Sequence, residues 1–184
     1  RMLDAEDSAS VLKILGETSY ASALTSQTGE LNFDKVLESD LHAIYEEVRT
    51  FTPDKELVDI MRLPYDFHNV KVLMKSMFNV RSGGKKRWDL LTSLGSYPVD
   101  DMISNIESED YRLLPFGLNL LYPKCVSVWE QSKDILEVER MLDQRLFEVM
   151  LEKASSLGIP GVKEWIRTRI DGENIRTLLR LKRF

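Results

Sequence analysis

Residues 33–51 of this chain read FDKVLESDLHAIYEEVRTF. Their apolar side chains recur every three or four positions, so that on an α-helix they would form one continuous stripe. The members of this stripe are Val36, Leu37, Leu41, Ile44, Tyr45, Val48 and Phe51. The opposite face carries charged residues, and the segment is therefore predicted to be a long amphipathic helix.

A second long helix is predicted from residue 135 onward, because the same spacing returns there. Its apolar positions are Ile135, Val138, Leu142, Leu146 and Val149. Asp134 is placed to cap its first turn, and Gly158 with Pro160 would end it. Shorter helices are expected over residues 8–15, 55–61, 99–106, 122–131 and 162–170. No stretch of β-branched residues alternates with polar ones between hairpin turns, and an all-α fold is therefore predicted.

The composition restricts the class of protein. With 184 residues and 43% hydrophobic content, the chain can bury a core as one unit or as two small lobes. Its formal charge of −5 disfavours nucleic-acid binding, which usually requires a basic surface. No run approaches the roughly 20 apolar residues that a membrane-spanning helix needs, so a soluble protein is expected. The chain begins at Arg1 without a signal segment, and we expect it to be part of a longer product.

No pattern predicts a catalytic, cofactor-binding or metal site. Cys125 is the single cysteine and has apolar neighbours, which favours a buried structural thiol over a nucleophile. His42 and His68 lack acidic or cysteine partners at metal-ligand spacing. Residues 83–86, GGKK, lack the spacing of a phosphate-binding loop and are predicted to be a flexible basic linker.

The chain contains an internal repeat. A shift of 101 residues places Glu38, Leu41 and Val48 on Glu139, Leu142 and Val149. A shift of 105 residues then places Arg62, Asp66, Asn69 and Leu73 on Arg167, Asp171, Asn174 and Leu178. The additional residues fall in the predicted loop 155–161, where insertions cost little. Two copies of one helical unit are therefore predicted.

Each copy carries an aspartate, an asparagine three residues later, then an aliphatic and a basic residue. The aspartate is predicted to be the N-cap of a helix, a role worth about 1 kcal/mol. The asparagine is expected to bond backbone groups of a neighbouring helix, with a ligand contact as the alternative. The buried stripes that this predicts are Val70, Leu73, Met74 and Met77 in the first copy, and Ile175, Leu178 and Leu179 in the second.

Four segments together resemble one protein family. Residues 65–76, YDFHNVKVLMKS, and 169–183, RIDGENIRTLLRLKR, are similar to the signature helices of the C subunit, also called the d subunit, of V-type and A-type ATPases. Residues 1–20, RMLDAEDSASVLKILGETSY, and 136–151, LEVERMLDQRLFEVML, resemble two further segments of that family. Gly172 and Pro64 are departures, because they weaken the helices in which they are expected.

The resemblance implies two pseudo-repeated helical bundle lobes of a three-lobed, funnel-like subunit. Residues 1–82 would form the first lobe without its N-terminal helix, residues 83–87 a linker, and residues 88–184 the second lobe. The signature residues, with a structural role, would be Glu38, Asp66, Asn69, Lys71, Glu139, Asp171, Asn174 and Arg176.

The function that the resemblance implies is mechanical. Such a subunit lies on the cytoplasmic face of the membrane and links the rotor shaft to the proteolipid ring, transmitting torque for ATP-driven proton or sodium transport or for ATP synthesis. It would be non-catalytic, bind no nucleotide, cofactor or metal, and meet the membrane only through the complex. Two alternatives stay open: a helical-repeat scaffold that binds protein partners, and an all-helical enzyme with a site between the lobes.

Overall fold

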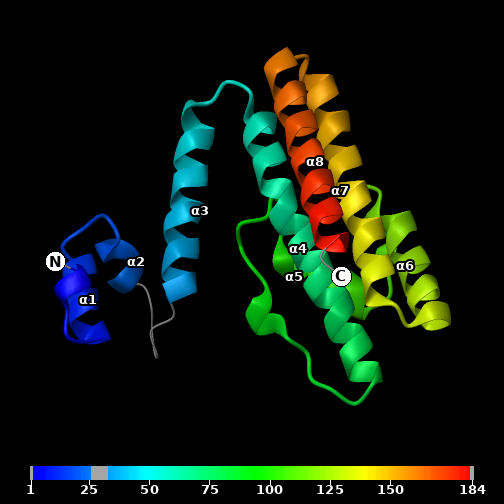
Figure 1. Ribbon diagram of the computed structural model, residues 1–184, viewed down its shortest axis with the longest axis horizontal. Helices are drawn as coiled ribbons and strands as arrows, with labels where there is room; N and C mark the ends of the chain where they lie inside the picture. Colours follow the sequence, from blue (N-terminus) through cyan, green and yellow to red (C-terminus); the bar gives the residue numbers. More distant parts are fainter. Residues whose placement is uncertain (1, 26–32, 183–184) are drawn as a thin grey trace. The chain divides into compact units, whose positions relative to one another are not determined.

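The computed structural model describes residues 2–25 and 33–182, and in these ranges it contains helices and loops but no strand (Figure 1). The all-α prediction is confirmed. The chain divides into two compact units, Arg1–Thr52 and Pro53–Phe184. Of the segments discussed above, residues 1 and 26–32 of the predicted first lobe and residues 183 and 184 of the second lie outside the described ranges.

Over residues 2–25 and 33–52, the first unit contains four helical elements. They are the 3-10 helix η1 (Met2–Asp4) and the α-helices α1 (Ser8–Leu15), α2 (Ala21–Thr25) and α3 (Phe33–Phe51). α1 begins where Asp7 Oδ1 accepts a hydrogen bond from Ser10 N at 2.8 Å, as an N-cap does. α2 packs against α3, and Val36 of α3 is buried. Both α1 and α3 have the bounds predicted from the sequence.

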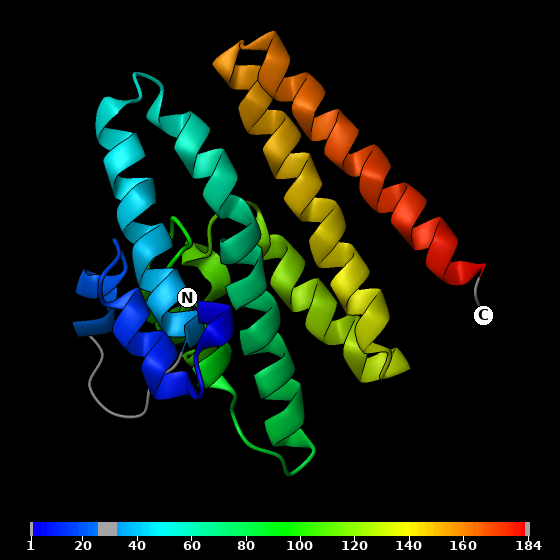
Figure 2. The same ribbon diagram turned by 60° about the vertical axis from the view of Figure 1, so that its left-hand side comes forward.

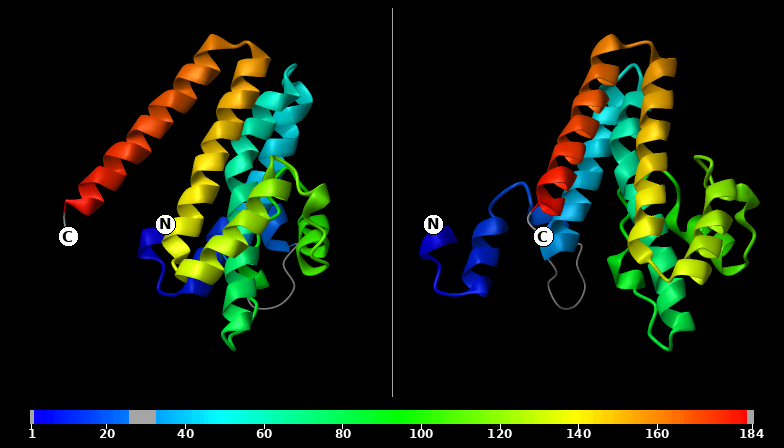
Figure 3. Two further views of the ribbon diagram at one scale, coloured as in Figure 1. Left: turned by 90° about the vertical axis from the view of Figure 1, so that its right-hand side faces the viewer. Right: turned by 45° about the vertical axis from the view of Figure 1, so that its right-hand side comes forward.

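The second unit holds the larger part of the fold (Figures 2 and 3). Its elements are α4 (Lys55–Arg81), η2 (Trp88–Leu90), α5 (Val99–Glu107), η3 (Tyr111–Leu113), α6 (Leu118–Ser132), α7 (Ile135–Leu157) and α8 (Pro160–Leu181). α4 packs against α7, α5 and η2, while α6 packs against α7 and η3. α8 returns antiparallel to α7 and packs against it.

α4 is a single helix of 27 residues that continues through Pro64. The prediction of a separate helix over residues 55–61, followed by a helix capped by Asp66, was therefore wrong. An internal proline removes one backbone hydrogen bond and costs about 3 kcal/mol. Side chains on both sides of it are buried, with Leu63 at 0% and Phe67 at 1% exposure, so tertiary packing offsets this cost.

α7 and α8 form a helical hairpin. Asp134 Oδ1 accepts from Leu136 N at 2.9 Å, which confirms the predicted cap of α7. Gly158 ends α7 with a left-handed φ of 68°, and Pro160 starts α8 at a position where its missing N–H costs nothing. α8 runs unbroken to Leu181, so Asp171 lies inside this helix and the prediction that it is an N-cap was wrong.

One hydrophobic core fills the second unit. Its fully buried members include Phe67 of α4, Met102 of α5, Tyr122 of α6 and Met150 of α7. At one end of the core the rings of Phe78 and Trp129 stack with centroids 4.0 Å apart. Of the stripe predicted in the first repeat, Val70, Leu73 and Met74 are at most 4% exposed, as predicted, whereas Met77 is only partly buried.

The predicted stripe of the second repeat is not buried in this structure. Ile175, Leu178 and Leu179 are 59%, 54% and 58% exposed. They lie in the half of α8 that diverges from α7 toward the C-terminal end, as Figures 2 and 3 show. The described elements of the second unit therefore place no layer over this part of α8.

Two long helices occur in the same order in both repeats, α3 with α4 and α7 with α8. The division into lobes at residues 82 and 88, and the superposition of the two copies, stay predictions. No helix in residues 2–25 or 33–182 combines the length and apolar character that crossing a bilayer requires.

Candidate functional site

Three polar side chains on one face of α4 are buried. Arg62, Asp66 and Asn69 are four and three residues apart, which places them one above the other along the helix. They are only 5%, 0% and 0% exposed. Buried polar groups are costly unless they are hydrogen-bonded, so their partners define what this face of α4 does.

Asp66 binds the loop that connects η2 to α5. Its Oδ2 accepts hydrogen bonds from Ser96 N at 3.1 Å and Ser96 Oγ at 2.8 Å, and its Oδ1 accepts one from Tyr97 N at 2.9 Å. Burial raises the pKa of the Asp66 carboxyl, and this outweighs the opposing effects of the hydrogen bonds from Tyr97 and Ser96 and of the Arg62 charge.

Arg62 and Asn69 hold the same loop by its backbone. Arg62 donates from Nε to Leu94 O at 2.9 Å and from Nη2 to Gly95 O at 2.7 Å. Asn69 donates from Nδ2 to Thr92 O at 2.8 Å and accepts from Thr92 N at 2.9 Å, which completes a two-bond pairing with one residue. We call these three side chains with residues 92–97 the α4 clasp.

The loop fits the clasp only because residue 95 is a glycine. A Cβ atom built at Gly95 would lie 2.3 Å from Asp66 Oδ1, well inside the contact distance of two atoms. Asp66 is held by its own hydrogen bonds and could not retreat without breaking them. The buried Asp66 of α4 therefore requires a glycine at position 95 of the loop.

The polar stripe extends along α4 beyond the clasp. Ser76 Oγ accepts from Arg87 N at 3.0 Å, and Asn79 Nδ2 donates to Lys85 O at 2.8 Å. The predicted linker 83–87 is thus bonded to α4 at two points. The prediction that Asn69 bonds backbone is confirmed, with the difference that its partner is a loop residue rather than a helix.

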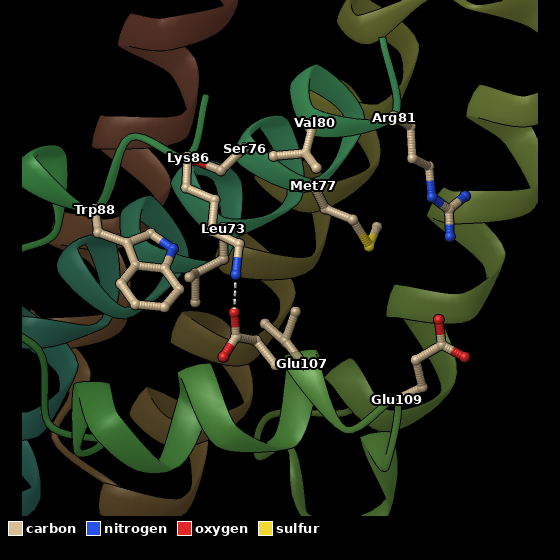
Figure 4. A pocket seen from close by; sticks show the side chains of 10 residues that line it. Leu73, Ser76, Met77, Val80, Arg81, Lys86, Trp88, Glu107 and Glu109 are labelled. Atoms are coloured by element: carbon tan, nitrogen blue, oxygen red, sulfur yellow. Dashed lines mark hydrogen bonds and ion pairs between the residues drawn. The ribbon is translucent and has the colours of Figure 1, made fainter. Parts of the chain in front are cut away.

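A pocket of about 280 Å³ lies beside this stripe, between α4, η2 and α5 (Figure 4). Leu73, Met77 and Ile106 are among its apolar lining residues. Lys86 forms an ion pair with Glu107 across it, as the dashed line in Figure 4 shows. The pocket thus has an apolar lining with charges of both signs, and within the described residues no group of three potential metal ligands occurs.

The remaining signature residues are not brought together with the clasp. Lys71 Nζ pairs with Asp143 Oδ1 at 2.5 Å, and Lys75 pairs with Glu139, so that both pairs join α4 to α7. Glu38 pairs with Lys35 at 2.7 Å within α3.

On α8 the second set of signature residues lies in solvent. Asp171, Asn174 and Arg176 are all exposed. Arg176 Nη1 pairs with Glu173 Oε1 at 2.8 Å within the same helix.

Sequence reasoning missed the partners of the clasp. Arg62 was aligned with Arg167 but given no contact, and Gly95 and Ser96 were not singled out. A short loop containing Thr, Gly and Ser just before a helix is common, so no local signal linked it to residues some thirty positions earlier. Only the repeat itself marked Arg62, Asp66 and Asn69 as a set.

The buried polar groups of the α4 clasp thus bond to another segment of the same chain. A family model described as ATP synthase (C/AC39) subunit matches residues 1–184 of this chain. The chain therefore belongs to this family of ATP synthase subunits.

Two curated relatives are the V-type ATP synthase C subunits of two strains of Thermus thermophilus. Each is 25% identical over 180 residues, which are 95% of this chain and 54% of the relative. The chain thus spans about half the length of these relatives. No solved structure matches it significantly.

Proposed function

We propose that this chain is part of the central-stalk coupling subunit of a rotary V/A-type ATPase. In this role it links the rotor shaft to the proteolipid ring on the cytoplasmic face of the membrane. It transmits torque for ATP-driven proton or sodium transport, or for ATP synthesis. The observation that carries the proposal is the match of the ATP synthase (C/AC39) subunit family over the whole chain.

The packing of the second unit suits a part that must transmit force. α4, at 27 residues, would be about 40 Å long. It packs against α7 through the hydrophobic core, and it holds residues 92–97 by hydrogen bonds, of which those from Arg62 are buried. Elements that are cross-linked in this way resist bending, because several contacts must break together.

The proposed role needs no chemistry from this chain. Its partners would be the shaft and the ring, and it would bind neither nucleotide nor metal. The buried Cys125 has a pKa raised to about 11 by burial, which keeps its thiol protonated and unsuited to nucleophilic attack near neutral pH.

The proposal is tested by reconstitution of the full-length protein. ATPase complexes that lack this subunit are mixed with purified full-length protein in proteoliposomes, and ion uptake per ATP hydrolysed is measured. Wild-type protein is expected to bind both the isolated shaft subunits and the ring, and to restore ATP-driven uptake.

Two variants refine this test. D66N loosens the α4 clasp without changing the surface and is expected to lower the uptake per ATP, whereas D143N, a change at a half-exposed position, is expected to behave as wild type. Failure of the wild-type protein to bind the shaft or the ring would contradict the proposal. Capture of unrelated helical peptides would favour a repeat scaffold, and turnover of a small substrate would favour an enzyme.

A further inference from the structure

The two repeats differ in what surrounds the same side chains. At the shift of 105 residues, Arg167, Asp171 and Asn174 of α8 correspond to the three side chains of the α4 clasp. They keep the same spacing on an unbroken helix, so they too lie on one face of α8. The geometry that holds a loop in the first repeat is therefore present in the second.

In the second repeat no described residue of the second unit covers this face. All three residues are exposed, and among the described residues the side chains of Asp171 and Asn174 make no hydrogen bond or ion pair. Arg167 makes a long ion pair of 3.5 Å with Glu164 one turn away. In contrast, the corresponding Asp66 and Asn69 are fully buried and fully bonded.

The apolar positions of the two repeats also differ in exposure. Ile175, Leu178 and Leu179 are more than half exposed, whereas their counterparts Val70, Leu73 and Met74 are almost completely buried. Adjacent exposed aliphatic side chains on one helix face are typical of a surface that another segment covers. The apolar and polar positions that lack cover lie on the same helix, in register with the covered face of α4.

We propose that Arg167, Asp171 and Asn174 form a second clasp, which holds a loop of this same polypeptide that follows Phe184 in the full-length protein. The first clasp takes partners at fixed distances along the chain: Asn69 binds 23 residues ahead, Asp66 binds 31 ahead and Arg62 binds 33 ahead. The same distances counted from α8 all lead past Phe184. The relatives are long enough to contain such a segment, since this chain matches only 54% of their length.

The chemistry of the second clasp specifies its occupant. Arg167 would donate to two consecutive backbone carbonyls, Asp171 would accept from backbone N–H and hydroxyl groups, and Asn174 would pair with one backbone amide unit. The position next to the carboxylate must be a glycine, as Gly95 is, because the space there is closed to a Cβ atom. The elements after this loop would then cover Ile175, Leu178 and Leu179. This inference concerns internal folding and does not rest on the proposed coupling role.

The first test uses unfolding of the isolated full-length protein. D171N is expected to lower its melting temperature by about 3 °C or more, as the loss of a buried, bonded carboxylate does. The matched control is E173Q, the same acid-to-amide change two residues away, whose counterpart His68 is exposed in the first repeat. It is expected to leave the melting temperature unchanged.

The second test measures the exposure of α8 directly, in case a variant fails to fold. I175C and the control R180C are labelled with a maleimide in full-length protein, and the modified peptide is quantified by mass spectrometry. The thiol of I175C is expected to react at least tenfold more slowly than that of R180C, whose counterpart Lys75 is half exposed.

Protection of I175C at every protein concentration, together with the D171N effect, would support the proposal. Equal labelling of I175C and R180C would overturn it. Protection that requires high protein concentration would assign the face to a second copy, and protection that requires added shaft or ring subunits would assign it to a partner. Either result would also overturn the proposal, while leaving the coupling role to be judged by reconstitution.

Discussion

Replacement of Asp66 by asparagine is expected to lower the free energy of unfolding of the second unit far more than an aspartate-to-asparagine substitution on the surface. The carboxylate is 0% exposed and accepts three hydrogen bonds, two from Ser96 and one from Tyr97. An asparagine keeps one oxygen and places an NH₂ group where the other was. Whichever way it turns, a donor then faces a donor, and at least one bond of the clasp is lost.

The magnitude follows from these contacts. A hydrogen bond to a charged group contributes about 1.5–3 kcal/mol, and a buried donor left without a partner costs about 1–3 kcal/mol. We therefore expect D66N to lower the free energy of unfolding by about 2–4 kcal/mol. For a chain of this size that corresponds to a fall in melting temperature of about 5–15 °C.

Tryptophan fluorescence in urea is a suitable assay, because Trp88, Trp129 and Trp165 all belong to the second unit and report on it alone. The matched control is D143N, whose side chain is 48% exposed and pairs with Lys71. Exposed pairs contribute at most about 1 kcal/mol. If D66N were no more destabilising than D143N, the α4 clasp would not stabilise the fold.

Three further outcomes follow from the same contacts. Burial raises the pKa of Asp66 in the folded protein above its ordinary value of 3.8. Protonation of this carboxyl therefore stabilises the folded state. This contribution is fully present below pH 3.8 and is lost as the pH rises through the folded pKa. The difference in unfolding free energy between wild type and D66N should therefore be largest below about pH 3.8 and should narrow as the pH rises through the folded pKa of Asp66, as urea titrations at a series of pH values would measure. G95A should lower the free energy of unfolding of the second unit by about 2–3 kcal/mol, because its Cβ would meet Asp66 Oδ1. The control is G161A, where a Cβ meets nothing within 4 Å. It should be neutral or slightly stabilising in the same urea assay. Burial and a pKa of about 11 should keep Cys125 unmodified by iodoacetamide at about pH 8 in the folded protein, with modification appearing by intact mass only after denaturation.

The amphipathic helices of this fold could be predicted from the sequence, because their apolar residues recur every three or four positions. α3 has the predicted bounds, and the cap of α7 at Asp134 was predicted, since both signals are local. α4 was predicted to break near Pro64, because the cost of an internal proline is visible in the sequence while the burial that offsets it is not.

The site could be predicted only in part, because the sequence shows local patterns but not which distant residues a buried side chain contacts. The repeat identified Asp66 and Asn69 as a matched pair, and a buried asparagine was expected to bond backbone. An aspartate that precedes a helical stretch is usually a cap, and its true partners, Ser96 and Tyr97, lie about thirty residues farther along. Nothing in the local pattern distinguishes a cap from a side chain that binds a distant loop.

The clasp also explains why α4 stays continuous. Pro64 lies between Arg62 and Asp66, and both of these side chains bind neighbouring residues of one loop, Gly95 and Ser96. A break in the helix at the proline would move the two side chains apart and would tear both sets of bonds. The hydrogen bonds from this loop therefore stabilise the helical conformation of α4 at Pro64, where a backbone hydrogen bond is missing.

The corresponding position of α8 is occupied by Arg169, a good helix former, instead of a proline. α8 is therefore an unbroken helix without a bonded loop along this face. Its own weak position is Gly172, which costs only about 1 kcal/mol. The two repeats thus combine the same polar triad with different helix interiors: in α4 the clasp offsets the cost of a proline, whereas α8 has no proline in its interior and stays helical without such contacts.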